Sequence, residues 1–419
     1  MTLSLPRAAV IPRDQRDELH PLLVALRDVG LPLVLTRLLL LAMTLTASDW
    51  RFAVPDPGRF LSQTPPVRGL LLARWYNWDA AWYLRVAGNG PQMGYSHFTA
   101  DVHHFNTFAF FPLYPLAVRV AALVVPGALD PVPAGGQIRP QLLVVALVVS
   151  NVLFVLALLA LYPLARSRAG PAAARRAVWL LCLFPTSIFF SAPYSESLFL
   201  LWLVLFFLAL GRRHWWLAAL CGALASATRS LGVGLVLPYL VAYWLNRRAG
   251  ARLVPVVLIP LGLAGYMLYQ WLAWGDPLLF QKAEQAWQRS LALPWAGIVD
   301  GLSWSLRGWP HLTQPQWRGL TDALYATVFV GLTALAWRDL EWVERAYAVV
   351  FWLYVLCEPQ ISDPNYPDTL ISMARFLLML LPLWLWLARS RRRTWLMAVP
   401  STLALLFYAA RWVNRGWIG

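Results

Sequence analysis

The chain has 419 residues, of which 59% are hydrophobic and only 13% are charged. Soluble domains contain roughly 45–50% apolar and about 25% charged residues, so this composition excludes a water-soluble globular exterior. The 24 tryptophans and 19 phenylalanines exclude a disordered chain, and three cysteines without metal-like spacing exclude a disulfide framework. The composition therefore predicts an all-α polytopic membrane protein.

The net charge of +15 comes from arginines that are grouped between apolar segments. In a soluble protein such a charge would suggest nucleic acid. Clusters such as those in 166–176 and 389–393 instead fit cytoplasmic loops that follow the positive-inside rule. We therefore expect membrane lipids, and no nucleic acid, as partners. Residues 1–30 carry charges throughout and lack an uninterrupted apolar core, which predicts a cytoplasmic lead-in instead of a signal peptide.

Apolar segments that approach the length of about 20 residues needed for a span recur along the chain. With a basic N-terminus inside, 31–47 runs outward, and 141–165 returns inward because the arginines of 166–176 follow it. The later predicted spans are 178–190, 198–210, 215–227, 233–245, 253–274, 320–337, 346–357, 376–388 and 395–410. Residues 1–419 are thus predicted to form a single integral membrane domain with about eleven transmembrane helices.

Residues 48–140 form a large first outer loop in this topology. The segment 108–126 within the loop is apolar, but counting it as a span would place the arginines of 166–176 outside. We therefore expect juxtamembrane helices in this loop, with 108–126 lying in or dipping into the outer interface.

The densest aromatic pattern of the outer loop is RWYNWDAAWYLR at 74–85. As one helix, this segment places Asp79 on the same face as Trp75, Trp82 and Tyr83. A carboxylate held among rings is a better proton acceptor, and aromatic faces suit the C–H face of a sugar. The same pattern also fits an aromatic belt at the membrane interface in which the aspartate only caps a helix.

Other ionisable residues gather at the same predicted pole. Glu196 follows Tyr194 in a polar turn, where it either lines the acceptor side of a cavity or only stabilises a helix N-terminus. Arg229 and Arg375 stand at the outer ends of apolar segments. A guanidinium there suits a lipid phosphate, although arginines at such positions also reach the head groups without a further role.

Three further residues are weaker candidates. Lys282 is the only lysine of the chain and stands in an interfacial segment. It either contacts a phosphate or is a cation without a functional role. His103 and His104 are adjacent, so they point to different faces of any regular element and make a poor metal site. They remain candidate hydrogen-bond donors to a hydroxylated ligand. No metal site is predicted.

Several of these motifs, in this order, resemble the PIG-V-type family of GPI mannosyltransferases. The matching pieces are Trp78-Asp79 with Trp82-Tyr83-Leu84, FFPLYP at 110–115, Ser150-Asn151, 185–197, Thr228-Arg229-Ser230, Gly275-Asp276-Pro277 and SMARF at 372–376. The resemblance extends from about residue 37 to about residue 417. It implies the GT-C fold, in which the first outer loop carries juxtamembrane helices and the catalytic aspartate, here Asp79.

The resemblance also implies a polyprenyl-phosphate-linked sugar as donor, without a metal or cofactor. We hypothesise that a hexose, with mannose as the first candidate, moves with inversion to a hydroxyl of a lipid or glycan acceptor at the outer face. Asp79 is the predicted base, and Arg375, Arg229 and Lys282 are the predicted phosphate contacts. The predicted sugar and acceptor pocket consists of Trp75, Trp78, Trp82, Tyr83, His103, His104, Tyr194 and Glu196.

Two other classes of function stay open at this point. A multi-span transporter would show acids within the membrane and inverted halves, whereas the acids here crowd one pole. A lipid-linked glycan polymerase or ligase would share the polar pole but would carry its large outer loop late in the chain. The use of 34 arginines and one lysine indicates a GC-rich bacterial coding bias, and hence a plasma membrane.

Overall fold

The computed structural model describes residues 26–47, 71–91, 107–130, 138–246, 250–284, 289, 291–359, 369–414, 416 and 418. The regular structure within these residues is helical, and they contain no extended strand. Much of the predicted first outer loop, including His103 and His104, lies outside the described residues.

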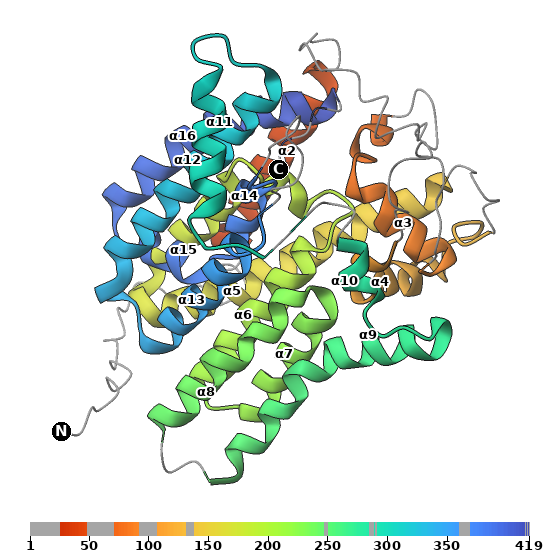
Figure 1. Cartoon of the computed structure of the whole chain (residues 1–419), viewed down its shortest axis with the longest axis vertical. Coiled ribbons are helices and arrows are strands. Elements are labelled where there is room, and N and C mark those ends of the chain that lie inside the picture. The colour runs from red at the N-terminus through yellow and green to blue at the C-terminus, as the bar shows by residue number, and fades with distance from the viewer. Residues whose placement is uncertain are drawn as a thin grey trace.

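The helical elements follow one another closely along the chain (Figure 1). Up to residue 245 they are η1 (Leu26–Gly30), α2 (Leu31–Thr46), η4 (Leu71–Trp75), α3 (Asp79–Asn89), η5 (Thr107–Ala109), α4 (Leu113–Ala122), α5 (Pro140–Leu183), η6 (Ser187–Phe190), α6 (Glu196–Gly211), α7 (Trp215–Thr228), η7 (Ser230–Leu235) and α8 (Val236–Leu245). The later ones are η8 (Gly250–Val257), α9 (Leu258–Trp274), α10 (Leu279–Glu284), α11 (Ala296–Arg307), α12 (Gln314–Ala336), η10 (Trp337–Asp339), α13 (Trp342–Leu356), α14 (Met373–Phe376), η11 (Leu377–Met379), α15 (Leu381–Ala388) and α16 (Arg391–Val413). Helices cover the apolar segments predicted from the sequence.

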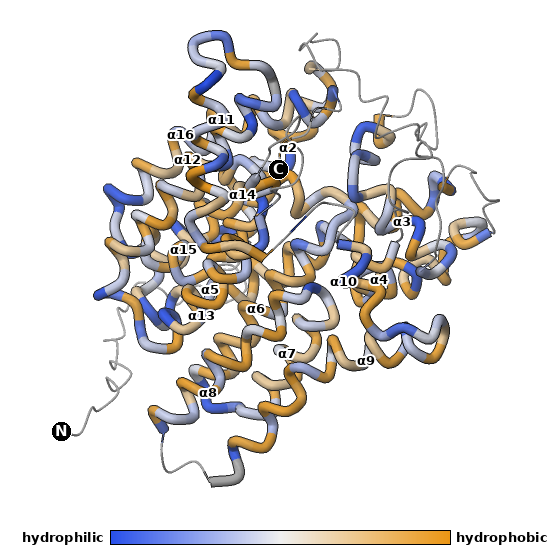
Figure 2. The backbone as a smooth tube through the Cα atoms, viewed as in Figure 1, coloured by the Kyte–Doolittle hydropathy of each residue, from blue (hydrophilic) through white to orange (hydrophobic). Residues whose placement is uncertain are grey.

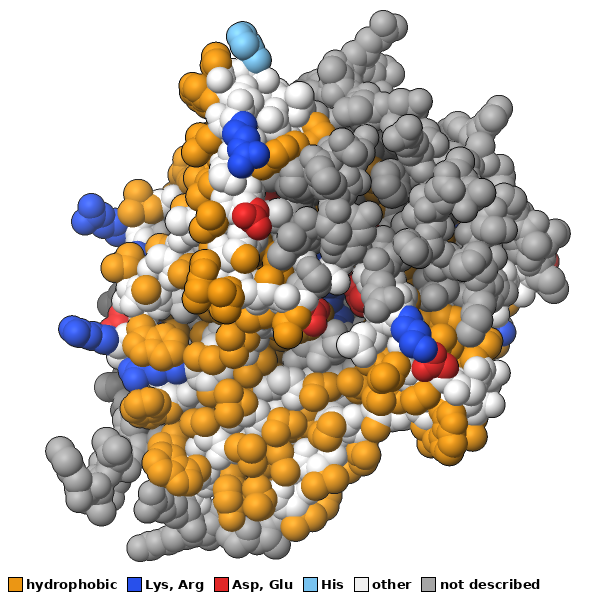
Figure 3. Space-filling view, in the orientation of Figure 1, with side chains coloured by type: hydrophobic (Ala, Val, Ile, Leu, Met, Phe, Trp, Pro, Cys, Tyr) orange, Lys and Arg blue, Asp and Glu red, His pale blue; other side chains and the backbone are white. Residues whose placement is uncertain are grey.

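Five helical stretches of the described residues are long and apolar enough to cross a membrane. They are Arg27–Thr46, Pro140–Leu183, Arg252–Trp274, Pro315–Asp339 and Arg391–Val413. Apolar side chains cover much of the lower part of the molecule in Figure 3, where the backbone in Figure 2 is coloured mostly as hydrophobic residues, as a lipid-facing surface requires. The chain is an integral membrane protein, and the number of about eleven spans stays a prediction.

Helix α6 occupies the centre of the helix bundle. Its sequence is apolar on all faces, which is the pattern of a helix that is buried all round. It packs against α5 on one side and α7 on another, and its residues are buried from Glu196 through nearly the whole helix. Because α6 is held on several sides, it fixes the position of the carboxylate at its first residue.

The predicted segment 141–165 and the first part of the predicted segment 178–190 belong to one long element, α5, which has a break inside it, whereas the end of the second segment forms η6. Ala169 and Gly170 leave helical geometry there, and Gly170 has a φ of +78°. Glycine accepts this left-handed value without a Cβ clash, and Pro171 then suits the first turn of the next helical part. The chain thus turns between two helical parts at the basic loop, as the charge pattern predicts.

The apolar segment 108–126 of the outer loop forms η5 and α4 instead of a full span. Ten helical residues in α4 cover about 15 Å, half of the roughly 30 Å of a bilayer core. Tyr114 and Val118 are buried against α3 and α5, while Val120 and Leu123 are exposed. A short helix with one buried and one exposed apolar face fits the predicted position in or near the interface.

Helices α7 and α9 approach each other closely at Gly262. A Cβ at this position would overlap the carbonyl oxygen of Ala223 and the Oγ of Ser226. The Ser226 hydroxyl also donates to the Ile259 carbonyl at 2.6 Å, across the same contact. Small residues and interhelical hydrogen bonds are the means by which membrane helices pack tightly.

We predict that Gly262→Ala lowers the free energy of unfolding by about 1–3 kcal/mol, because the added methyl group forces α7 and α9 apart. Gly265→Ala on the same helix is the matched control, since a Cβ there meets no atom within 4 Å. Thermal unfolding of both purified variants in detergent checks the prediction. Equal midpoints for the two variants would contradict it.

Candidate functional site

The N-terminus of α6 places a carboxylate inside the protein. Glu196 is only 1% exposed. Its Oε1 accepts a hydrogen bond from Arg229 Nη1 at 2.6 Å and lies 3.5 Å from Arg375 Nε. Removing a carboxylate from water is costly unless cations and hydrogen bonds compensate for it. Glu196 therefore holds two arginines that are far apart in the sequence at one point.

Arg375 lies on the short helix α14 and joins a second carboxylate to this point. Its Nη1 donates to Asp79 Oδ2 at 2.7 Å. Its guanidinium also lies over the rings of Phe189 and Tyr194, at 5.3 and 5.6 Å from their centroids. Burial alone would lower the pKa of Arg375, but the carboxylates of Asp79 and Glu196 raise it, so this guanidinium stays charged.

Asp79 is the first residue of α3, not a mid-helix residue. The predicted helix over 74–85 is wrong in its first part, because Trp75 belongs to the separate turn η4 and Trp78 has a φ of +54°. Trp75 is therefore not one helical turn before Asp79 on a common face. The Asp79 backbone N–H donates to the Tyr194 hydroxyl, which in turn donates to the Asn77 carbonyl, both at 3.1 Å.

Each partner of the Asp79–Arg375 ion pair comes shortly after a residue whose backbone φ lies in the left-handed region. Trp78 precedes Asp79, and Ser372, with a φ of +71°, caps the helix of Arg375. Non-glycine residues at such angles cost on the order of 1 kcal/mol or more and persist where surrounding contacts determine them. The fold thus holds the two side chains against each other at the expense of backbone strain.

Tyr83 and Ser195 extend the polar cluster towards the aromatic residues. The two hydroxyl oxygens are 2.8 Å apart, and Arg229 Nη1 donates to the same Ser195 hydroxyl at 3.4 Å. The Tyr83 ring packs edge-on against Phe110 and Tyr114, at centroid distances of 5.0 and 5.3 Å. Burial raises the pKa of Tyr83 above its ordinary value, so the side chain stays a neutral phenol.

The other predicted pocket residues lie in or around this cluster to different extents. Tyr194 is fully buried and contacts the Arg375 guanidinium, and Tyr83 is part of the network. Trp82 stacks on Phe110, with ring centroids 6.1 Å apart, and Trp78 is half-buried next to Asp79. Trp75 is half-buried at the end of η4.

The structure does not bring Lys282 into this cluster. Its Nζ donates to Asp276 Oδ2 at 2.5 Å, and its side chain is 60% exposed. The hydrogen bonds from Lys282 and from the Leu278 backbone N–H lower the pKa of Asp276. The only lysine of the chain is thus held in a local ion pair of the turn that leads into α10, and its role as a phosphate contact stays a prediction.

Arg289 is a functional candidate that the predicted site lacked. Its guanidinium lies 5.6 Å from the ring centroid of Phe376. The guanidinium groups of Arg229 and Arg375 lie 5.4 and 5.8 Å from the same centroid. Arg229 and Arg375 form ion pairs with carboxylates, whereas the described residues show no ion pair of Arg289, whose charge acts on the nearby carboxyl group of Glu284. The sequence signal is weak, since Arg289 is only one isolated base at the acidic pole.

Glu284 is a further, half-buried acid in the same region. Burial raises its pKa above the ordinary value, and the nearby Arg289 partly opposes this effect. Figure 3 shows acidic and basic side chains that lie together in the middle of the view, above the apolar surface. Among the residues that the structure describes, no group of three His, Cys, Asp or Glu side chains is arranged to hold a metal ion.

We predict that Asp79 and Arg375 are energetically coupled. A double-mutant cycle with Asp79→Asn and Arg375→Gln should give a coupling of about 1–3 kcal/mol in the free energy of unfolding, because each single change leaves a buried charge without its partner. The exposed pair of Asp276 and Lys282 is the control and should show no measurable coupling. Additive effects at Asp79 and Arg375 would contradict the observed contact.

Comparison with known proteins gives matches in sequence and in structure. A family model described as Mannosyltransferase (PIG-V) matches residues 35–247, a region that contains Asp79, Glu196 and Arg229 but not Arg375. The chain is 34% identical over 181 residues to human GPI alpha-1,6-mannosyltransferase 2, covering 42% of this chain and 32% of the relative. The Cricetulus griseus protein of the same name is 35% identical over 189 residues, covering 43% and 34%.

The chain therefore spans about a third of the length of the curated relatives it matches. Similar solved structures include ArnT from Cupriavidus metallidurans bound to undecaprenyl phosphate, with a TM-score of 0.45 and 16% identity, covering 86% of this chain and 61% of that one. The apo oligosaccharyltransferase of Archaeoglobus fulgidus gives a TM-score of 0.40 and 14% identity, covering 90% and 56%.

Proposed function

Because the chain belongs to the PIG-V mannosyltransferase family, we propose that it is a glycosyltransferase that moves a hexose, with mannose as the first candidate, from a polyprenyl phosphate to an acceptor hydroxyl. The acceptor is a lipid or a glycan. The observation that carries this proposal is the Asp79 carboxylate, which Arg375 holds at 2.7 Å in a cluster with the buried Glu196. The arrangement supplies a proton acceptor beside several cations, which is what displacement of a phosphate by an alcohol requires.

Asp79 is the proposed general base. It accepts the proton of the acceptor hydroxyl while the hydroxyl oxygen bonds to the anomeric carbon and the bond from that carbon to the phosphate oxygen breaks. Attack from the side opposite to the phosphate inverts the anomeric configuration. The leaving group is a phosphate monoester, a stable anion, so the step needs neither a general acid nor a metal ion.

The phosphate is proposed to bind at the arginines around Phe376. Arg289 forms no ion pair among the described residues, and it adds a third cation beside the Phe376 ring, with Glu284 as a nearby acid. Arg375 is shared with Asp79, so a phosphate that approaches Arg375 would draw its guanidinium away from the carboxylate and leave Asp79 available as a base. Charge-assisted hydrogen bonds of this kind are strongest where the charge develops during reaction.

The aromatic side chains around the cluster are proposed to shape the sugar and acceptor pocket. Trp82, Tyr83 and Tyr194 present rings and hydroxyl groups beside the network. The tyrosine hydroxyls stay protonated because burial raises the pKa of both Tyr83 and Tyr194. The proposed pocket also includes Trp75, Trp78, His103 and His104.

The proposed site faces the non-cytoplasmic side. The support is the charge pattern, since the arginine-rich loops lie at the opposite ends of the same helices, as at Arg212 and Arg213 after α6. A bacterial plasma membrane is the proposed location. A transporter or a glycan polymerase is not favoured, because the family match points to a transferase.

We predict that Asp79→Asn lowers sugar transfer from a synthetic polyprenyl-phosphate mannose at least about 100-fold, because the proton of the hydroxyl loses its acceptor. Asp276→Asn is the control, since this carboxylate binds only Lys282 and a local backbone N–H. Rates are measured on purified variants whose thermal unfolding matches that of the wild type. Near wild-type turnover of Asp79→Asn would reject the base, and equal use of a nucleotide sugar would reject the donor class.

We predict that Arg289→Gln raises the KM for the lipid donor about tenfold or more, because the phosphate loses a cation that no ion pair of the described residues holds. Lys282→Gln should change KM less, since Lys282 must first leave Asp276. Steady-state kinetics at varied donor concentration with fixed acceptor separates the two variants. A larger KM increase in Lys282→Gln than in Arg289→Gln would instead indicate that the phosphate binds at the turn before α10 and not near Phe376.

A further inference from the structure

A groove of about 780 Å³ lies at the end of α6 opposite to Glu196. It is lined by Arg213 and His214 before α7, by residues 215–217 at the start of α7, and by Arg252 and Val254 of η8. Since α6 has 16 residues, this end lies about 24 Å along the helix from the catalytic cluster. The groove therefore opens near the other membrane surface and takes no part in the proposed reaction.

The polar lining of the groove consists of donors. Arg213, His214 and Arg252 line it, and none of the lining residues is acidic. The groove also contains the first turn of α7, whose N-cap His214 makes no side-chain cap hydrogen bond. The N-terminus of a helix carries free backbone N–H groups and a partial positive charge, which together favour an anion.

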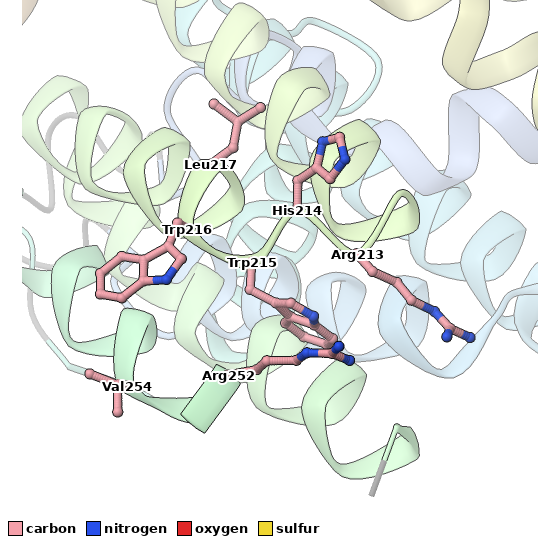
Figure 4. A pocket seen from close by; sticks show the side chains of 7 residues that line it. All are labelled: Arg213, His214, Trp215, Trp216, Leu217, Arg252 and Val254. Atoms are coloured by element: carbon pink, nitrogen blue, oxygen red, sulfur yellow. The ribbon is translucent and has the colours of Figure 1, made fainter. Parts of the chain in front are cut away.

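Trp215 supplies an independent sign of a missing ligand. Its side chain is 95% buried, yet no acceptor of the described structure lies within hydrogen-bonding distance of its indole Nε1. In Figure 4 the indole reaches from the start of α7 towards the Arg252 side chain. A buried N–H group is normally hydrogen-bonded, so an unpartnered one that lines a groove points to an acceptor that enters from outside.

The polar wall of the groove is built before any ligand enters. The Trp215 ring packs edge-on against Tyr239, with centroids 5.5 Å apart. The Tyr239 hydroxyl in turn donates to the Arg252 carbonyl at 2.7 Å. These contacts fix the indole and the backbone of Arg252 relative to each other.

The apolar part of the groove faces the lipid. Trp216 is 63% exposed and Val254 is 59% exposed, and Figure 4 shows both on the side away from Trp215 and Arg252. A free anion gains no binding energy from an apolar surface, whereas the acyl chains of a lipid bury apolar area against it. We propose that this groove binds an anionic phospholipid, with the phosphate at the N-terminus of α7 between Arg213, Arg252 and the Trp215 indole.

The test uses the full-length protein in a neutral detergent, with phosphatidylglycerol, phosphatidylcholine or inorganic phosphate added. Phosphatidylglycerol should raise the thermal midpoint by several degrees, and phosphatidylcholine and inorganic phosphate should not. Arg213→Gln/Arg252→Gln should lose most of this shift, and Trp215→Phe, which keeps a ring but removes the N–H, should lose part of it. Arg391→Gln/Arg392→Gln removes the same charge from two exposed arginines outside the groove and should keep the shift.

Three results would overturn the proposal. If both double variants lost the thermal shift equally, the lipid would be attracted to the basic surface in general. If inorganic phosphate raised the midpoint as much as phosphatidylglycerol, the ligand would be a soluble anion. If phosphatidylcholine raised it as much, apolar contact alone would explain the shift. A photoreactive phosphatidylglycerol on the wild-type protein locates the lipid without any variant. Labelling of residues 213–217 or 252–254 supports the site, and labelling elsewhere alone rejects it.

Discussion

The buried carboxylate of Glu196 is the constraint on which the polar centre depends. Helix α6 is enclosed by its neighbours, so its first residue cannot reach bulk water and must be compensated by Arg229 and Arg375. Losing one partner of such a cluster leaves an uncompensated buried charge, which is strongly destabilising. The compensation therefore brings the start of α6, the end of α7 and the short helix α14 to one point, and Arg375 adds Asp79 from the outer loop.

The charges of this cluster are compatible with the proposed base and the proposed phosphate site in one place. Asp79 and Glu196 formally cancel the charges of Arg229 and Arg375, so the cluster is stable without a ligand. Arg289 is a third cation at the Phe376 ring, and Glu284 is the acid near it. The strained residues before Asp79 and Arg375 keep the ion pair in place, so that the proposed phosphate would compete for a guanidinium whose position is already set.

Helix α6 separates two sites with opposite characters. Its N-terminus carries the carboxylate cluster, and its C-terminal end leads into the groove of arginine, tryptophan and free backbone donors before α7. The first is built from segments distant in sequence, and the second largely from consecutive residues at a turn. A lipid bound at the groove would contact both α7 and η8. Helix α7 also packs closely on α9 at Gly262, so α7 links the groove to a tight contact of the bundle.

The sequence by itself determined the membrane class, the family and the approximate positions of the helices, and it singled out Asp79, Arg229, Arg375 and Glu196 as candidate site residues. These follow from local properties, because the length of an apolar segment and the composition of a short motif do not depend on distant residues. Only the tertiary structure decided that α3 begins at Asp79, that Lys282 pairs with Asp276, that Arg289 lies on Phe376, and that an indole N–H stays unpartnered in a groove. The contact of Arg289 with Phe376 depends on which distant segments meet, and the other three depend on backbone and side-chain geometry that residue types alone do not specify.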